Sequence, residues 1–256
     1  MNKEFVIELN DLTTGYGQHA VTSHIHAVLR PGQLISLLGP NGVGKSTLLR
    51  TLGAFQPPLG GEIRVGGQPI GEMTSAQLSR IIGVVLTERP DIQNMTVRDM
   101  VSMGRSPYTG FWGRLTPEDE TLVDEAMQQT GVTDLSDRMI NTLSDGERQK
   151  VMIAKALAQH TPIILLDEPT AFLDFPSKVE MMRLLGRLAH QMQKIIFLST
   201  HDVEMALQLS DSLWLMTREG ITTGTPSQLA QDGTVARFIQ CEGVLFDATT
   251  LTLRIG

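Results

Sequence analysis

The alternation and clustering of apolar residues along the chain predict an α/β fold. Residues 5–9 alternate between apolar and polar positions, as a half-buried antiparallel strand does, and residues 22–29 give a second strand. The uninterrupted apolar run at residues 163–166 is typical of a central strand in a parallel sheet, because such strands are buried on both faces. Further strands are expected at residues 33–38, 83–86, 194–198 and 212–216.

A block of helical pattern interrupts these strands from about residue 89 to residue 138. Thr96 is suited to cap one helix, and Thr116 followed by Pro117 and acidic residues forms a strong start for the next. The helices expected in and just after this block cover residues 97–103, 119–130 and 143–159. We therefore predict a helical insertion in an α/β domain, with no linker composition on either side.

Shorter elements complete the expected fold. Residues 62–65 and the glycine pair after them suggest a short hairpin, and residues 13–17 suggest a turn. The tail at residues 243–256 alternates enough to form a terminal hairpin, to which we assign no chemistry. Other helices are expected at residues 75–81, 178–191 and 203–209.

Composition narrows the class of protein. The 256 residues include 41% hydrophobic ones, enough for a sizeable core, and the net charge of −7 argues against nucleic acid as a partner. The single cysteine, Cys241, excludes an internal disulfide and fits a reducing compartment. No apolar run approaches the roughly 20 residues that cross a bilayer, and the N-terminus lacks a secretory signal. We expect a soluble cytoplasmic protein that can dock on a membrane partner.

A phosphate-binding loop comes after the predicted strand at residues 33–38. It has two glycines separated by four residues and followed by Lys and Ser, and its members are Gly39, Pro40, Asn41, Gly42, Val43, Gly44, Lys45, Ser46 and Thr47. The glycines let successive N–H groups point inward at anionic oxygens, Lys45 reaches the outer phosphates, and the Ser46 hydroxyl is suited to Mg²⁺. A helix start at Ser46 adds its positive dipole end. The pattern predicts nucleotide binding.

Two carboxylates, Asp167 and Glu168, come directly after the strand at residues 163–166. A doubly wound sheet places ligands at this end of its strands. Asp167 is suited to hold Mg²⁺, and Glu168 to take a proton from an attacking water. Alone, the pair would be interpreted as a helix N-cap. With the phosphate loop and with His201 after the next strand, the catalytic interpretation is preferred.

Together these residues resemble the nucleotide-binding subunit of ATP-binding cassette (ABC) transporters, over essentially the whole chain up to about residue 229. Residues 143–147 resemble that family's signature motif, residues 163–168 its Walker B motif, residues 171–174 its D-loop and His201 its switch histidine. The resemblance implies that Tyr16, otherwise an ordinary turn tyrosine, stacks on adenine. It further implies nucleotide contacts by Ser144, Gly146, Glu147 and Asp174.

The resemblance also implies an architecture and a set of partners. The expected fold is a phosphate-loop ATPase core with a mixed, mostly parallel sheet, an antiparallel β subdomain and an inserted helical subdomain. The core would span residues 1–88 and 160–240, the helical signature subdomain residues 89–159 and the tail residues 241–256. One chain carries one phosphate loop and one signature, so a head-to-tail homodimer would complete two ATP sites. Its other partners would be integral-membrane permease subunits with an associated substrate-binding protein, at the inner face of the cell membrane.

Two positions depart from the family's pattern. Asp145 stands where the signature usually has its first glycine, and its carboxylate would have to point away from the phosphates. The strand near residue 86 usually leads to a glutamine that reaches Mg²⁺, but here Thr87 occupies that place and Glu88 comes next. We expect Thr87 to line the metal site through a water molecule and Glu88 to face the membrane partner.

Within the family the chain most resembles the ATPases of importers for iron–siderophore, haem and vitamin B12. The segments that carry this likeness are residues 97–107, 143–149 and 156–159. Zinc or manganese import stays open, because the subunit does not touch the cargo. The alternative from another class is a soluble ABC-type ATPase of iron–sulfur cluster assembly, and residues 104–107 favour the importer. A nucleotide-binding scaffold without turnover is disfavoured by Glu168 and His201.

Overall fold

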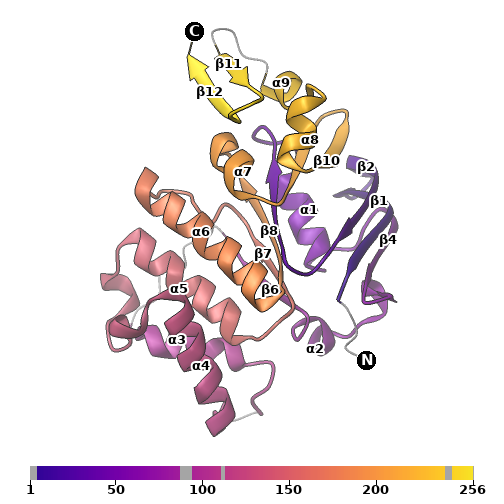
Figure 1. Cartoon of the computed structure of the whole chain (residues 1–256). Coiled ribbons are helices and arrows are strands. Elements are labelled where there is room, and N and C mark those ends of the chain that lie inside the picture. Colours follow the sequence, from indigo (N-terminus) through magenta and orange to yellow (C-terminus); the bar gives the residue numbers. More distant parts are fainter. Residues whose placement is uncertain (1–4, 87–93, 111–112, 240–243, 256) are drawn as a thin grey trace.

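Two large sheets, a two-stranded hairpin and several groups of helices make up the described part of the molecule (Figure 1). The computed structural model describes residues 5–86, 94–110, 113–239 and 244–255. A six-stranded sheet lies at the centre, a four-stranded antiparallel sheet lies on one side of it, and the helices of the inserted block lie on the other. This arrangement confirms the predicted α/β fold class, including its antiparallel and helical additions.

The central sheet has the strand order β10-β9-β3-β8-β7-β6, and only its β10–β9 pair is antiparallel. The sequence predicted five of these strands and missed β10, a polar edge strand that is recognisable only by its pairing with β9. The strands are β3 (Gln33–Leu38), β6 (Ile82–Val85), β7 (Ile163–Leu166), β8 (Ile195–Thr200), β9 (Ser212–Thr217) and β10 (Gly220–Gly224).

The antiparallel sheet has the order β2-β1-β4-β5. Its strands are β1 (Ile7–Tyr16), β2 (His19–Leu29), β4 (Gly60–Val65) and β5 (Gln68–Pro69), and the tail forms the hairpin of β11 (Val244–Asp247) and β12 (Thr252–Ile255). The expected turn at residues 13–17 is wrong, because β1 continues to Tyr16, which pairs with His19. Register shifts after Leu9 and Leu12 carry the strand through this polar stretch.

The helices agree with the sequence pattern except near the C-terminus. In the described part of the chain they are α1 (Lys45–Leu52), α2 (Ser75–Leu78), α3 (Val97–Ser102), α4 (Pro117–Thr130), α5 (Asp145–Ala158), α6 (Phe175–Met192), α7 (Val203–Leu209), α8 (Pro226–Gln231) and α9 (Thr234–Ile239). Short 3₁₀ turns cover Ile70–Glu72, Met103–Arg105, Thr133–Leu135 and Ile140–Thr142. Helix α6 begins three residues earlier than predicted, because Asp174 caps it and a proline occupies its first turn. Helices α8 and α9 were not predicted.

The central strands separate two hydrophobic cores. On β7, Ile164 and Leu166 pack with α3 to α6, whereas Ile163 and Leu165 pack with α1 and the antiparallel sheet. Strand β8 divides its residues in the same alternating way. Because neighbouring side chains of a strand point to opposite faces, a strand that is covered on both sides must be apolar throughout. A third cluster packs Leu38 of β3 and Leu215 of β9 against α7 and α8. Together the clusters cover both faces of the sheet up to its carboxyl edge.

A buried ion pair joins the parts of the helical insertion. Arg105 Nε lies 2.8 Å from Asp119 Oδ1, and an Arg105 Nη1–H donates to the Ala158 carbonyl at 2.8 Å. Both side chains are less than a tenth exposed. Asp119 also accepts a hydrogen bond from the Thr116 amide at 2.9 Å. One carboxylate therefore both pairs with the guanidinium of Arg105 and caps the start of α4.

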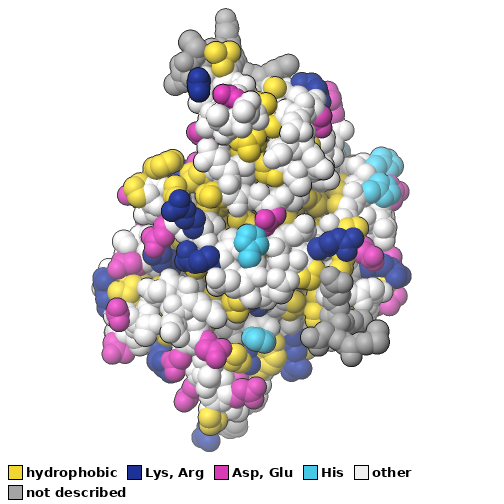
Figure 2. All heavy atoms as spheres, viewed as in Figure 1, with side chains coloured by type: hydrophobic (Ala, Val, Ile, Leu, Met, Phe, Trp, Pro, Cys, Tyr) yellow, Lys and Arg dark blue, Asp and Glu magenta, His cyan; other side chains and the backbone are white. Residues whose placement is uncertain are grey.

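The surface carries charges of both signs. In the view of Figure 2, Lys and Arg side chains are interspersed with Asp and Glu rather than gathered into one basic stripe. Among the described residues, no helix combines the length and the apolar character needed to cross a membrane.

Lys194 is buried at the amino-terminal edge of the central sheet. Its side chain is 5% exposed, and its Nζ donates to the Thr161 carbonyl at 2.5 Å. Burial lowers the pKa of Lys194 to about 8, from the ordinary 10.5. The folded protein therefore binds this proton less tightly than the unfolded chain, and the charged lysine costs stability below pH 8.

We predict that Lys194→Met removes part of the pH dependence of stability. Between the two pKa values the unfolded chain binds more protons than the folded protein, so the free energy of unfolding of the wild type should rise with pH. Lys194 should account for about 2 kcal/mol of this rise between pH 8 and pH 10. Urea unfolding at pH 8, 9 and 10 measures the slope, and Lys155→Met on α5 is the control. Equal slopes in wild type and Lys194→Met would contradict the assignment.

Candidate nucleotide site

The phosphate loop connects β3 to α1 and needs glycine at defined positions. Gly42 and Gly44 have φ values of 76° and 114°, in the region that other residues rarely adopt. A Cβ on Gly44 would also lie 2.1 Å from Val21 Cγ1, and a Cβ on Gly39 would lie 2.8 Å from the Met216 carbonyl. The loop is therefore pressed against β2 and β9, and its shape depends on glycine.

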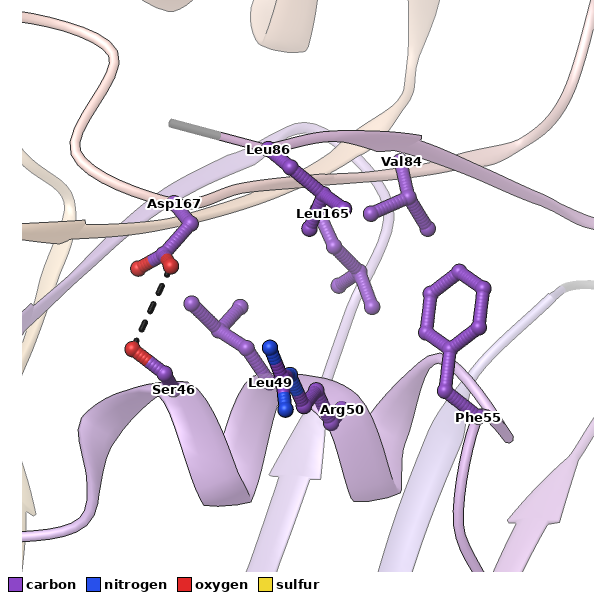
Figure 3. A pocket seen from close by; sticks show the side chains of 8 residues that line it. All are labelled: Ser46, Leu49, Arg50, Phe55, Val84, Leu86, Leu165 and Asp167. Atoms are coloured by element: carbon purple, nitrogen blue, oxygen red, sulfur yellow. Dashed lines mark hydrogen bonds between the residues drawn. The ribbon is translucent and has the colours of Figure 1, made fainter. Parts of the chain in front are cut away.

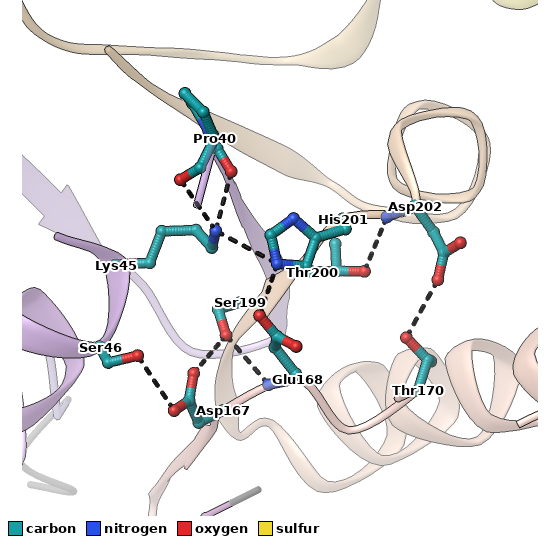
Figure 4. A network of polar contacts seen from close by, with 11 residues as sticks. Pro40, Lys45, Ser46, Asp167, Glu168, Thr170, Ser199, Thr200, His201 and Asp202 are labelled. Carbon is teal, nitrogen blue, oxygen red and sulfur yellow. Dashed lines mark hydrogen bonds and ion pairs between the residues drawn. The ribbon is translucent and has the colours of Figure 1, made fainter. Parts of the chain in front are cut away.

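Lys45 holds its ammonium group at the mouth of this loop. Nζ donates to the Gly39 carbonyl at 2.8 Å and lies 3.4 Å from the Pro40 carbonyl (Figure 4). Burial lowers the pKa of Lys45, while Glu168 and Asp167 act in the opposite direction. The site thus places a partly desolvated cation, suited to an anionic ligand, beside two carboxylates, which are suited to a cation.

The two predicted metal ligands from distant parts of the sequence are neighbours. Ser46 Oγ lies 3.2 Å from Asp167 Oδ2 (Figures 3 and 4). Adjacent oxygens in an octahedral Mg²⁺ shell are about 3.0 Å apart, given metal–oxygen distances near 2.1 Å. Hard oxygen donors at this separation fit Mg²⁺ that keeps its other positions for phosphate and water. Among the described residues no group of three or more His, Cys, Asp or Glu side chains could hold a metal ion by itself.

Glu168 contacts the predicted switch histidine. Glu168 Oε1 lies 2.6 Å from His201 Nε2, and Lys45 Nζ lies 3.4 Å from the same nitrogen. One ring nitrogen cannot donate to the carboxylate and accept from the ammonium at once. The shorter distance assigns the proton of Nε2 to the bond with Glu168, so the contact with Lys45 is between two donors.

Tyr16 links the antiparallel sheet to the loop. Tyr16 as a whole is 50% exposed, and its hydroxyl accepts from Thr47 Oγ1 at 3.2 Å. An exposed aromatic face at the end of β1, next to the start of α1, is a suitable platform for a base. A separate hollow beside the loop apex is lined by Val21, residues 40–43 and Arg218, which the sequence analysis did not single out.

The predicted signature residues lie at the start of α5, in the helical insertion. Ser144 caps α5, where Ser144 Oγ accepts from the Glu147 amide at 3.3 Å and Glu147 Oε2 accepts from the Ser144 amide at 2.8 Å. In the part of the chain that the structure describes, no hydrogen bond or ion pair joins Ser144, Gly146 or Glu147 to the phosphate loop. Asp145 is the first residue of α5 and has helical geometry, so this position does not need glycine for its backbone.

Asp174 serves the fold locally. Its Oδ1 accepts from the Ser177 amide at 3.1 Å, and its hydrogen bonds with Ser177 are the main cause of its lowered pKa. Phe172, two residues earlier, has a φ of 64° and is 71% exposed. Thr87, the third predicted metal residue, and Glu88 lie outside the described residues.

A cavity lies between α1 and the strands β6 and β7. Figure 3 shows Ser46 and Asp167 at one end of it and the Phe55 ring at the other. Its floor is apolar, with side chains from Leu49, Val84, Leu86 and Leu165, and Arg50 also lines it. The cavity therefore extends from the two candidate metal oxygens to the exposed ring of Phe55, and Leu86, the last described residue before Thr87, is part of its lining.

Sequence reasoning missed a set of side chains that brace the site. Asp202, directly after His201, accepts from Thr170 Oγ1 at 3.2 Å and from Lys178 Nζ at 3.0 Å. Ser199 Oγ lies between Asp167 and the Glu168 amide (Figure 4). In the sequence, Ser199 and Asp202 are marked only by their position at or just after the end of β8. This position predicts a contact with the site only when the neighbouring strand is known.

A phosphate loop, a nearby metal-type carboxylate and a glutamate beside it define the class of phosphate-loop nucleotide hydrolases. A model of the ABC transporter family matches residues 22–171. The chain belongs to the ABC transporter family, as one of its ATP-binding subunits, and hydrolyses ATP to drive transport. Subunits of this family dimerise, pair with permease subunits and associate with membranes.

Several relatives match most of the chain. The chain is 34% identical over 251 residues to the ferric enterobactin transport ATP-binding protein FepC of Escherichia coli K12, covering 96% of this chain and 92% of that protein. It is 39% identical over 211 residues to an uncharacterised ABC transporter ATP-binding protein of Methanocaldococcus jannaschii, covering 82% and 73%. The petrobactin import ATP-binding protein FpuC of Bacillus anthracis is 35% identical, with 83% and 78% covered.

Solved structures agree with the fold. A putative metal-chelate type ABC transporter in an inward-facing conformation matches with a TM-score of 0.77 at 26% identity, covering 88% of this chain and 85% of that one. The cbiO1 protein of Clostridium perfringens, part of the transporter complex cbiONQ, matches with a TM-score of 0.79 at 29% identity, covering 91% and 94%.

We predict that Tyr16→Ala weakens ATP binding about tenfold, because base stacking contributes about 1–3 kcal/mol. Tyr16→Phe should bind within about twofold of wild type, since it keeps the ring and loses only the bond with Thr47. Titration with a fluorescent ATP analogue measures both affinities. Equal losses in the two variants would instead assign the effect to the hydroxyl.

Proposed function

We propose that this chain is the ATP-hydrolysing motor subunit of a membrane importer for iron–siderophore, haem or cobalamin. The observation that carries the proposal is the 34% identity with the ferric enterobactin transport ATPase over 96% of the chain. Support also comes from petrobactin and iron(3+)-hydroxamate import ATPases and from a cobalamin import ATPase of Halobacterium salinarum at 39% identity over 75% of the chain. A metal-chelate type transporter among the structural neighbours fits the same cargo class.

The proposed chemistry is based on the geometry of the site. Lys45 and the loop amides hold the phosphates, Glu168 accepts the proton of the attacking water, and the imidazole of His201 orients Glu168 across 2.6 Å. Ser46 and Asp167 would hold Mg²⁺, which when bound neutralises charge on the phosphate oxygens. Tyr16 would carry the adenine.

We propose a head-to-tail homodimer as the active unit. Ser144, Gly146 and Glu147 belong to the helical insertion, and among the described residues no hydrogen bond or ion pair joins them to their own loop. In a two-fold dimer the signature of one subunit would cover the phosphate loop of the other, completing two sites at once. Hydrolysis then removes a bridging phosphate and loosens the pair.

We propose that the two parts of the chain have different roles. Residues 1–88 and 160–240 would hydrolyse ATP, residues 89–159 would contact the partner, and residues 241–256 would form a tail. Permease subunits, with their substrate-binding protein, would be the membrane partners, and the motor would sit on the cytoplasmic face. We assign no nucleic-acid partner, in keeping with the net charge of −7.

Co-purification from detergent-solubilised membranes tests the importer. A polytopic permease should accompany the tagged chain, and its binding protein would identify iron chelate, haem, cobalamin, zinc or manganese as cargo. Co-purification with iron–sulfur assembly proteins and no permease would support the alternative of a soluble cluster-assembly ATPase.

We predict that Glu168→Gln lowers ATP turnover by a factor of roughly 10² or more while keeping ATP affinity. The variant should accumulate an ATP-bound dimer, measurable by size-exclusion chromatography with Mg-ATP. Glu180→Gln on α6, an exposed glutamate paired with Lys150, is the matched control. Near-normal turnover in Glu168→Gln would remove Glu168 as the base.

A mixture of Lys45→Ala and Ser144→Ala chains should hydrolyse ATP faster than either variant alone. A mixed head-to-tail dimer has one site with both defects and one intact site. Steady-state phosphate release measures the rescue, and cross-linking verifies that mixed dimers form. Mixed dimers without rescue would argue against composite sites.

A further inference from the structure

Ser199 lies inside the site without belonging to any motif singled out above. It is on β8, two residues before His201, and its side chain is fully buried. Its hydroxyl makes two bonds to the neighbouring segment: Ser199 Oγ–H donates to Asp167 Oδ1 at 2.7 Å, and Ser199 Oγ accepts from the Glu168 amide at 2.9 Å (Figure 4). One hydroxyl therefore touches both carboxylate residues.

The first bond selects which oxygen of Asp167 faces the phosphate loop. Ser199 engages Oδ1, and Oδ2 is the oxygen that receives the hydroxyl of Ser46 at 3.2 Å. A carboxylate rotates easily about its terminal torsion unless one oxygen is held. The serine thus presents Oδ2 toward the candidate cation position, as outer partners of metal ligands commonly do.

The second bond fixes the backbone that carries Glu168. This residue has a φ of 49°, in the left-handed region, where a non-glycine residue is strained by about 1–2 kcal/mol. Its amide has the Ser199 hydroxyl as acceptor, and its carbonyl accepts from the Ala171 amide at 3.0 Å. In this conformation the carboxylate reaches His201 at 2.6 Å. A loss of the acceptor would release the strain by moving the glutamate.

We propose that Ser199 is a positioning residue that keeps the metal-side carboxylate and the general base in a fixed mutual orientation. The proposal rests on the roles proposed above for Asp167 and Glu168. Because the hydroxyl acts on both, its removal should weaken divalent-cation affinity and lower kcat together. Nucleotide affinity measured without a divalent cation should stay unchanged, since the two hydrogen bonds of the Ser199 hydroxyl go to Asp167 and Glu168 and not to the phosphate loop.

Ser199→Thr and Ser199→Val are the matched pair, because the two side chains have the same shape and only threonine keeps the hydroxyl. Mn²⁺ serves as the probe, and its affinity for the ADP-loaded protein is measured by electron paramagnetic resonance. The lost hydrogen bond goes to a charged group, and such bonds are roughly twice as strong as neutral ones. Relative to Ser199→Thr, Ser199→Val should therefore bind Mn²⁺ about tenfold more weakly and have a kcat about tenfold lower. The KM for ATP and the affinity for a fluorescent ATP analogue in EDTA should agree within about twofold.

Ser36 provides the control for burial alone. It is also fully buried and lies on the adjacent strand β3. Its hydroxyl forms a 2.7 Å hydrogen bond with Ser210 Oγ, and this bond does not involve the two carboxylates. Ser36→Val should lower thermal stability without changing Mn²⁺ affinity. If Ser199→Val does not fold, Ser199→Ala, which leaves more space, is compared with wild type by the same measurements.

Equal Mn²⁺ affinity and kcat in Ser199→Thr and Ser199→Val would overturn the proposal. So would a loss of kcat with unchanged Mn²⁺ affinity, because the hydroxyl would then act on Glu168 alone. Failure of the proposed catalytic function is recognised separately, by normal turnover in Glu168→Gln.

Discussion

The parallel register of β3, β7 and β8 is the constraint on which the rest of the structure depends. Leu38 pairs with Thr200 and Leu166 with Leu198, so the three strands end at one edge of the sheet within a few residues of each other. This register brings together the phosphate loop after β3, the two carboxylates after β7 and His201 after β8. Hydrogen bonds of 2.6–3.2 Å then connect residues that are more than thirty positions apart. Such precision needs strands that are held from both faces, which the hydrophobic clusters on the two sides of the sheet provide.

The packed sheet maintains strained backbone conformations at the site. Glu168 and Phe172 have left-handed backbone geometry in the segment after β7. Each conformation would relax in a free peptide. Here the segment is held by Ser199 on one side and by the bonds of Asp202 with Thr170 and Lys178 on the other. Strain that the fold sustains in this way is typical of functional positions.

The separation of Ser144 from the phosphate loop has a physical meaning for the motor. The predicted signature residues lie at the start of α5, inside a helical block with its own buried ion pair between Arg105 and Asp119. A block that is rigid in itself can move as a unit toward or away from a nucleotide on another subunit. This arrangement suits a cycle in which ATP is part of the contact between subunits, as in the proposed dimer.

Local patterns in the chain were enough to predict most elements and the chemistry of the candidate site. Periodicity predicted five central strands and the helices through α7, because burial on one or both faces imposes a pattern on consecutive residues. Glycine spacing located the loop, because only glycine tolerates its backbone geometry. Three features became visible only in the folded chain. First, strand β1 extends through Tyr16 because it pairs with β2. Second, β10, α8 and α9 are short polar segments that carry little periodic signal. Third, Ser199 reaches Asp167 and Glu168 from a neighbouring strand. Contacts across strands depend on strand order and register, and no local pattern in the chain encodes these.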